Sequence, residues 1–271
     1  DISKVTKMSK NNSYVIKVLN SEIITKQENN ENGEIVYDTE KLNSYFNEYE
    51  ELNQLNHPNI IKAFGFFNGN NEQKPFIALE YCPYNLKSAI KILNNVEIVG
   101  IVYEICDTMK FLHHHGHIHR CLKPNNILLD EKKHVKLSDF GISALLTETE
   151  QAQNPQQTLG SFQFIAPELI TGQSEISEKC DVYSFGMTLY FLLTKGELPK
   201  VNPAEMVAGI KPVFNDTTNE MAQGIIQRCL SIDPANRPSF NDLVNEIRNN
   251  DFQLIDGIED DIETLKDFLQ I

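Results

Sequence analysis

The stretch HIHRCLKPNN, residues 117–126, places side chains that can meet phosphate, metal and protons within a few positions of one another. Lys123 carries a positive charge that can offset a phosphate, and Asn126 offers an amide oxygen. Further along the chain, Asp139 opens the tripeptide DFG and adds a carboxylate. Because Mg²⁺ prefers oxygen ligands of this kind, Asn126 and Asp139 are candidate metal ligands.

Cys121, in the middle of this stretch, leaves two kinds of chemistry open. A thiol is mostly protonated at neutral pH and is a weak hydrogen-bond acceptor, so it is a poor general base. It can instead serve as a nucleophile or a metal ligand, because histidines crowd around it in the sequence. These are His113, His114, His115, His117 and His119.

Short apolar or alternating runs dominate the first part of the chain and predict strands over 13–19, 60–67 and 75–81. Residues 40–55 repeat apolar side chains at helical spacing, which predicts one helix among these strands. After Pro83 the pattern becomes mostly helical, interrupted by the short strand-like runs NILL and HVKLSDF. The predicted helices span 86–93, 98–115, 179–194, 219–230 and 239–248. We therefore expect an α+β, bilobal architecture with a cleft at the junction near residues 80–85.

The last segment, residues 251–271, repeats apolar side chains on one helical face opposite several acids. These apolar residues are Ile255, Ile258, Ile262, Leu265 and Leu269. The pattern predicts an acidic amphipathic helix or tail that either docks back onto the helical lobe or binds a partner.

Composition narrows the functional classes. The formal net charge of −14 over 271 residues opposes nucleic acid or an anionic membrane as the main partner, because both would repel such a surface. Five scattered cysteines with no C-x-x-C pair favour a reduced, cytoplasmic or nuclear protein over a disulfide-bonded one. No apolar run approaches the roughly 20 residues of a membrane helix. Because the chain lacks an initiator methionine, we expect a fragment of a longer protein.

Several further motifs follow one another in a fixed order. VIK at 15–17 ends a predicted strand, Glu48 lies on the following helix, and HRCLKPNN and DFG come next. They are followed by APE at 166–168, DVYSFG at 181–186 and RPSF at 237–240. This order and spacing resembles the eukaryotic protein kinase family, from about residue 2 to about residue 249. The resemblance implies a strand-rich lobe at about 1–82, a helical lobe at 83–250, and ATP and Mg²⁺ as cofactors.

The resemblance also assigns roles to single residues. Lys17 would hold the α- and β-phosphates, and Glu48 would orient that lysine. Asp139 and Asn126 would ligate Mg²⁺, and Lys123 would contact the transferring phosphate. Leu79 would be the gatekeeper, while the main chain of Glu80 and Cys82 would meet adenine. Val5 lies twelve residues before Lys17, which puts Ser3 at the last glycine of the glycine-rich loop.

Cys121 departs from the family pattern. Active members carry Asp there, which accepts the proton of the substrate hydroxyl. Losing a general base costs roughly 10²–10⁴-fold in rate, so we expect a pseudokinase that regulates or scaffolds a partner protein. The alternative is a Ser/Thr protein kinase of reduced activity acting on protein hydroxyls, since the L-K-P form of the loop is typical of that class. Nucleophilic or metal-dependent thiol chemistry is a third interpretation.

Two expectations concern residues outside the predicted cofactor site. Glu168 and Arg237 resemble a buried ion pair that ties the activation segment to the helical lobe, and Asp181 resembles the residue that holds the backbone of the catalytic loop. The activation segment, 139–168, contains no Lys or Arg. It is either an unmodified polar loop or a site of phosphorylation that Arg120 would pair with. The candidate hydroxyls are Thr147, Thr149 and Thr158.

Overall fold

The computed structural model describes residues 2–7, 13–18, 39–70, 73–139, 162–171, 176–199, 201–210, 212–214 and 219–271. Within β1 and at some positions of β2, α2 and α9, including Glu48, only the backbone is described. The chain divides into two compact units, Asp1–Pro83 and Tyr84–Ile271. The three candidate threonines of the activation segment, Thr147, Thr149 and Thr158, lie outside the described residues.

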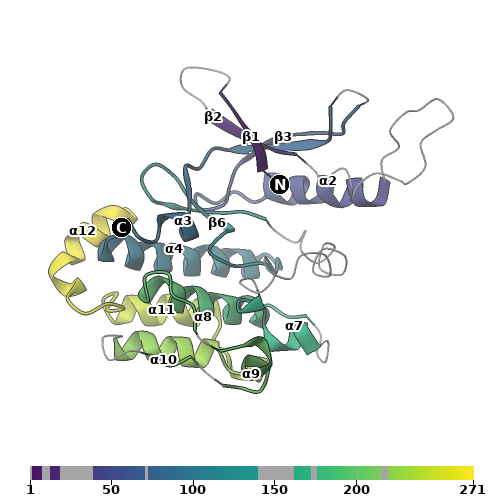
Figure 1. Cartoon of the computed structure of the whole chain (residues 1–271). Coiled ribbons are helices and arrows are strands. Elements are labelled where there is room, and N and C mark those ends of the chain that lie inside the picture. The colour runs from purple at the N-terminus through teal and green to yellow at the C-terminus, as the bar shows by residue number, and fades with distance from the viewer. Residues whose placement is uncertain are drawn as a thin grey trace. The chain divides into compact units, whose positions relative to one another are not determined.

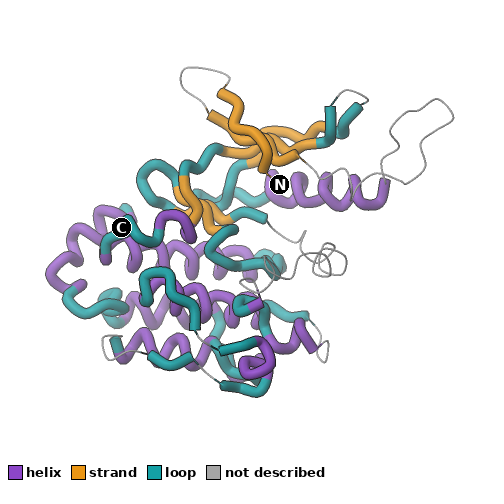
Figure 2. The backbone as a smooth tube through the Cα atoms, viewed as in Figure 1, coloured by secondary structure: helices purple, strands orange, loops and turns teal. Residues whose placement is uncertain are grey.

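The first unit contains a four-stranded antiparallel sheet and a helix (Figure 2). Its strands are β1 (Ile2–Lys7), β2 (Ser13–Val18), β3 (Ala63–Phe67) and β4 (Phe76–Glu80), in the spatial order β1-β2-β4-β3. The helix α2 (Thr39–Gln54) packs on β3, where the rings of Phe46 and Tyr49 lie 5.5 and 6.2 Å from that of Phe66. The predicted strands and helix are confirmed, and β1 is an element that the sequence pattern missed.

The second unit is mostly helical (Figure 1). It also contains a small three-stranded sheet of order β5-β6-β7. The sheet comprises β5 (Tyr84–Asn85), β6 (Ile127–Leu129) and β7 (Val135–Leu137). The longer helices are α4 (Asn95–His114), α8 (Lys179–Leu193), α10 (Glu220–Cys229), α11 (Phe240–Asn249) and α12 (Ile262–Leu269). The shorter ones are α3 (Leu86–Ala89), α7 (Pro167–Thr171), α9 (Pro203–Val207), η1 (Pro234–Asn236) and η2 (Ile258–Asp261).

Helix α8 lies at the centre of the core of this unit. Every residue from Cys180 to Leu192 is buried, so this helix is surrounded by protein on all sides. Helix α10 packs on α8, while α11 and α12 both pack on α4. A strand-rich unit followed by a larger helical unit is the bilobal α+β fold that the sequence predicts.

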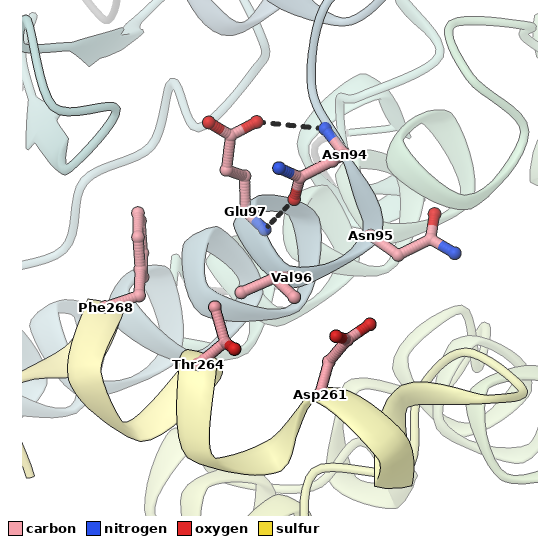
Figure 3. Close-up of a pocket in the computed structure, with 7 residues that line it drawn as sticks. All are labelled: Asn94, Asn95, Val96, Glu97, Asp261, Thr264 and Phe268. Carbon is pink, nitrogen blue, oxygen red and sulfur yellow. Dashed lines mark hydrogen bonds between the residues drawn. The ribbon is translucent and has the colours of Figure 1, made fainter.

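Two predicted helices have the wrong bounds. The segment predicted as a helix over 86–93 contains only α3, which ends at Ala89. The Asn94 side chain accepts a hydrogen bond from the backbone of Glu97, whose carboxylate accepts one from the Asn94 backbone (Figure 3). This capping box starts α4 at Asn95, three residues before the predicted start. The tail is not one continuous helix either, since Gly257 adopts a left-handed φ of 83° and α12 begins only at Ile262.

The predicted ion pair between Glu168 and Arg237 is confirmed. The Arg237 guanidinium donates two parallel hydrogen bonds to the Glu168 carboxylate, at 2.6 and 2.8 Å. It also donates to the main-chain carbonyls of Ser231, Lys179 and Ile232. The Arg237 side chain is 0% exposed and that of Glu168 is 6% exposed, so each charge depends on the other for compensation.

Replacing Arg237 with alanine should therefore lower the free energy of unfolding by about 3–5 kcal/mol, because the Glu168 charge would remain buried without its partner. The control is Arg228→Ala, which breaks a pair with Glu246 whose side chains are 48% and 30% exposed. That change should cost about 0–1 kcal/mol. Urea unfolding of both variants measures the difference, and equal losses would contradict the role given to Arg237.

Candidate active site

Asp181 organises the loop that carries Cys121. This carboxylate, at the start of α8, is 0% exposed. One oxygen accepts a hydrogen bond from the backbone N–H of Arg120 at 2.7 Å. The other lies 2.8 Å from the backbone N–H of His119 and 2.9 Å from Nε2 of His113. The predicted hold of Asp181 on the loop backbone is confirmed, and His113 is an additional partner that the sequence did not indicate.

Arg120 adopts a left-handed backbone with φ of 64°. That conformation costs a non-glycine residue about 1–3 kcal/mol, and it persists only where surrounding contacts enforce it. Here it lets two successive N–H groups converge on one carboxylate, in the manner of a backbone nest around an anion. Asp139 also has a positive φ, of 60°. Arg120 and Asp139, both in motifs, are thus two of the described non-glycine residues with a left-handed backbone.

His119, in the same loop, is fully buried. Its Nδ1 accepts a hydrogen bond from the backbone N–H of Cys121 at 3.3 Å. Burial lowers the pKa of His119, while the nearby Asp181 and Asp139 and hydrogen bonds to the backbone act in the opposite direction. A neutral imidazole is therefore favoured, which leaves Nδ1 able to accept from the loop.

The side chain of Asn126 turns toward Cys121. Its Nδ2 donates to the Cys121 carbonyl at 2.9 Å and approaches Sγ at 3.1 Å. Asn126 is 6% exposed, whereas Cys121 is half-buried. Because both contacts use the amide nitrogen, neither occupies Oδ1, the atom suited to a metal ion.

Ser138 joins the two candidate metal ligands, and sequence reasoning missed it. Asn126 precedes β6 and Ser138 follows β7, and the antiparallel pairing of these strands brings the two residues opposite each other. The backbone N–H and the hydroxyl of Ser138 both approach the Asn126 carbonyl, at 3.1 and 3.0 Å. The hydroxyl also lies 3.4 Å from Oδ2 of Asp139. The available signal was a hydroxyl residue directly before the DFG aspartate.

Asn126 and Asp139 together present an amide oxygen and a carboxylate at the same end of the β6–β7 hairpin. Mg²⁺ is commonly held by one or two such protein oxygens, with water and phosphate completing its octahedron. This donor set fits Mg²⁺. Among the described residues, no group of three or more His, Cys, Asp or Glu side chains is arranged to hold a metal ion. That finding gives no support to a metal centre built from the histidines.

In the first unit, β2 and β4 position the residues predicted to meet the nucleotide. Val15 pairs with Leu79 and Lys17 with Ile77. Because cross-strand partners share a face and residues two apart on a strand do too, Lys17 and Leu79 lie on one face of the sheet. Val5 pairs with Val15 on the adjacent strand β1, so it stands at the same level of the sheet.

Glu80 ends β4, and Cys82 follows it just before the end of this unit. The backbone N–H of Glu80 donates to the Lys62 carbonyl at 2.8 Å, and its side chain accepts from the Lys62 backbone at 3.3 Å. The side chain of Glu48 lies outside what the structure describes, so its pairing with Lys17 stays a prediction. The adenine contacts of Glu80 and Cys82 likewise stay predictions.

An open hollow of about 650 Å³ lies between the first turn of α4 and α12 (Figure 3). Its lining includes Glu97, Asp261 and Phe268 and none of the predicted site residues. Because none of the predicted site residues lines it, the hollow is separate from the candidate site. The two acids in its lining also make it unsuited to nucleotide phosphates.

A family model, described as the protein kinase domain, matches residues 1–247. The chain belongs to the protein kinase domain family. This match confirms the resemblance drawn from the motifs, and it extends from the strand-rich unit into α11. Residues 248–271 lie beyond the matched region. Within the described part of the chain, no helix has the length and hydrophobicity required to cross a membrane.

Curated relatives carry protein kinase names, and two of the three described here are named serine/threonine kinases. The 3-phosphoinositide-dependent protein kinase B of Dictyostelium discoideum is 31% identical over 88% of this chain and 25% of its own length. Serine/threonine-protein kinase dst1 of the same organism is 32% identical over 77% of this chain and 29% of that protein. Serine/threonine-protein kinase 12 of Arabidopsis thaliana is 30% identical over 80% of this chain and 50% of its own length. This kinase domain thus spans between a quarter and a half of these three relatives.

The hold of Asp181 on the loop can be tested by Asp181→Asn. An amide keeps one acceptor oxygen but points a donor at an N–H group, so the kinase domain should lose about 3 kcal/mol of unfolding free energy. The control is Asp233→Asn at the exposed start of η1, where asparagine caps as well as aspartate and the change should stay within about 0.5 kcal/mol. Chemical denaturation measures both, and a loss below 1 kcal/mol for Asp181→Asn would count against the assigned hold.

Proposed function

We propose that this kinase domain binds ATP with Mg²⁺ and acts as a pseudokinase that regulates or scaffolds a partner protein. The contact of Asn126 with Cys121 supports this most directly. Cys121 is in register with the loop position where active kinases carry the aspartate base. A carboxylate there could accept the Asn126 hydrogen bond at one oxygen and a substrate hydroxyl at the other. The thiol offers a single weak acceptor atom, and Asn126 Nδ2 already lies 3.1 Å from it.

In this proposal the chain keeps the means to bind nucleotide. Lys17 pairs with the α- and β-phosphates, and Leu79 closes the back of the adenine pocket. The main chain of Glu80 and Cys82 meets the adenine edge. Asn126 and Asp139 would hold Mg²⁺, which neutralises phosphate charge when bound. Ser138 binds the Asn126 carbonyl through its hydroxyl, which lies 3.4 Å from Oδ2 of Asp139.

The second candidate is a Ser/Thr protein kinase of reduced activity. The serine/threonine kinase names of the relatives favour it, as does the L-K-P sequence that follows Cys121. Active kinases turn over at roughly 1–100 per second, and loss of a general base costs about 10²–10⁴-fold. The residual rate would be about 10⁻⁴ to 1 per second. In this case Lys123 would still offset charge on the transferring phosphoryl group.

Partners and compartment follow from the same proposal. A protein substrate or a regulated protein fits a kinase domain, whereas the net charge of −14 disfavours nucleic acid and anionic membrane surfaces. The five cysteines are all free thiols, which fits a reducing compartment such as the cytoplasm.

Nucleotide binding should appear as thermal stabilisation. At a concentration of Mg·ATP about 100 times its Kd, the folded state gains about 2.7 kcal/mol, so the melting temperature should rise. Asp139→Asn should remove the Mg²⁺-dependent part of the shift, while the distant Asp233→Asn control should keep it. No shift in the wild type at millimolar Mg·ATP would contradict nucleotide binding.

Phosphoryl transfer separates the two candidates. Radiolabelled phosphate incorporation is compared among the wild type, Cys121→Asp and Cys121→Asp combined with Asp139→Asn. The pseudokinase predicts a silent wild type and a gain of at least about 10²-fold in Cys121→Asp that the second change abolishes. Equal rates for the wild type and Cys121→Asp would favour the active kinase. Silence in all three would mean that the site lacks more than its base.

A further inference from the structure

The segment that follows α11 folds back onto α4 as part of the second unit (Figure 1). Asp251 and Phe252 both adopt left-handed backbones, with φ of 49° and 58°, and reverse the chain there. Four apolar side chains of the segment are then 0–7% exposed: Phe252, Leu254, Ile258 and Leu265. The segment is therefore held by burial, although it lies beyond the family match.

Phe268, on the last turn of α12, lies against both α4 and the loop before β7. Its ring is stacked on the imidazole of His134, with centroids 4.6 Å apart and planes 30° apart. A Cβ atom placed on Gly100 of α4 would overlap Cε1 of the same ring. Glycine at position 100 thus leaves the space that the ring needs.

The same imidazole is bound to a buried carboxylate of α4. His134 Nδ1 lies 2.6 Å from Oε1 of Glu104, and the Glu104 and His134 side chains are 9% and 17% exposed. The second oxygen of Glu104 accepts the backbone N–H of Val135, the first residue of β7, at 2.8 Å. Glu104 therefore fixes the start of the strand that leads to Ser138 and Asp139.

We propose that His134 is a proton-dependent latch that couples the C-terminal segment, residues 250–271, to strand β7. Protonated His134 places its charge between the Glu104 carboxylate and the face of the Phe268 ring, and both stabilise a cation. Neutral His134 keeps the stacking but loses the charge that strengthens both contacts. Docking of α12 is accordingly tighter when His134 carries a proton.

The charges around His134 set the direction of this effect. From α4, the hydrogen bond to Glu104 raises the pKa of His134, and burial opposes it. From the β6–β7 turn, Asp130 raises the pKa and Lys132 lowers it, while α12 presents the uncharged Phe268 ring. The net effect is a pKa above the ordinary 6.5. The stabilisation is therefore fully present below pH 6.5 and is lost as the pH rises through the raised pKa.

The test uses the whole chain without nucleotide, so it does not depend on the proposed function. The His134 imidazole is titrated by NMR, and amide exchange of residues 262–271 and 135–138 is measured from pH 6 to pH 8.5, corrected for intrinsic rates. In the wild type the His134 pKa should exceed 6.5, and protection of both segments should fall across that pKa. In His134→Phe, which keeps an aromatic ring for stacking, protection should be independent of pH.

Two further variants separate the contacts. Phe268→Leu should lower the His134 pKa by about half a pH unit, the size expected for a partly exposed cation–ring contact. Gly100→Ala keeps His134, Glu104 and Phe268 in the sequence but should displace the ring and lower protection of residues 262–271. The matched control is Gly224→Ala in α10, where the nearest atom to the added Cβ, Nη1 of Arg228, is 3.8 Å away.

Protection of residues 262–271 that is independent of pH in the wild type would overturn the proposal, as would an identical pH dependence in His134→Phe. An unchanged His134 pKa in Phe268→Leu would show that protonation of His134 is not coupled to α12. If Gly100→Ala and Gly224→Ala changed the protection of residues 262–271 equally, the packing of Phe268 against Gly100 would not be what holds α12.

Discussion

The buried carboxylate of Asp181 is the interaction on which the candidate site depends. A charge with no solvent exposure must be compensated by hydrogen bonds, and Asp181 receives them from the backbone of His119 and Arg120 and from the ring of His113. In return it holds Arg120 in a left-handed conformation that arginine would otherwise avoid. The path of the loop from Arg120 through Cys121 toward Asn126 therefore depends on these hydrogen bonds.

Cys121 is integrated into that framework. Its backbone N–H is held by His119, and its carbonyl and sulfur are both approached by Asn126. Two of these three contacts use the backbone of Cys121, and only the contact of Asn126 with the sulfur depends on the side chain at this position. Under the proposed function, a thiol where the family carries aspartate changes the acceptor chemistry at one atom, so nucleotide binding and phosphoryl transfer are tested separately.

Two buried acids of the second unit act on the backbone in the same way, from different helices. Asp181 of α8 binds the loop that precedes β6, and Glu104 of α4 binds the start of β7. The β6–β7 hairpin, whose ends carry Asn126 and Asp139, is thus attached to the helical core on both sides. The C-terminal segment reaches this hairpin through Phe268 and His134, so a part of the chain beyond the family match contacts the support of the candidate metal site.

The sequence by itself determined the family, the α+β class and the register of the motifs. Motifs of charged or polar side chains at fixed spacings, which include Lys17, Asp139 and Glu168, identified the family. Local hydrophobic periodicity identified most of the strands and helices. The helix bounds differ from the predicted ones at Asn94 and Gly257, where a side-chain cap and a glycine with positive φ decide where the helix begins. Hydrophobic periodicity does not reveal such single hydrogen bonds and φ angles. Only the tertiary structure decided which partners distant residues have. His134 and Phe268 meet because α12 packs on α4, and Ser138 meets Asn126 because β6 pairs with β7, contacts that depend on chain folding rather than on local sequence.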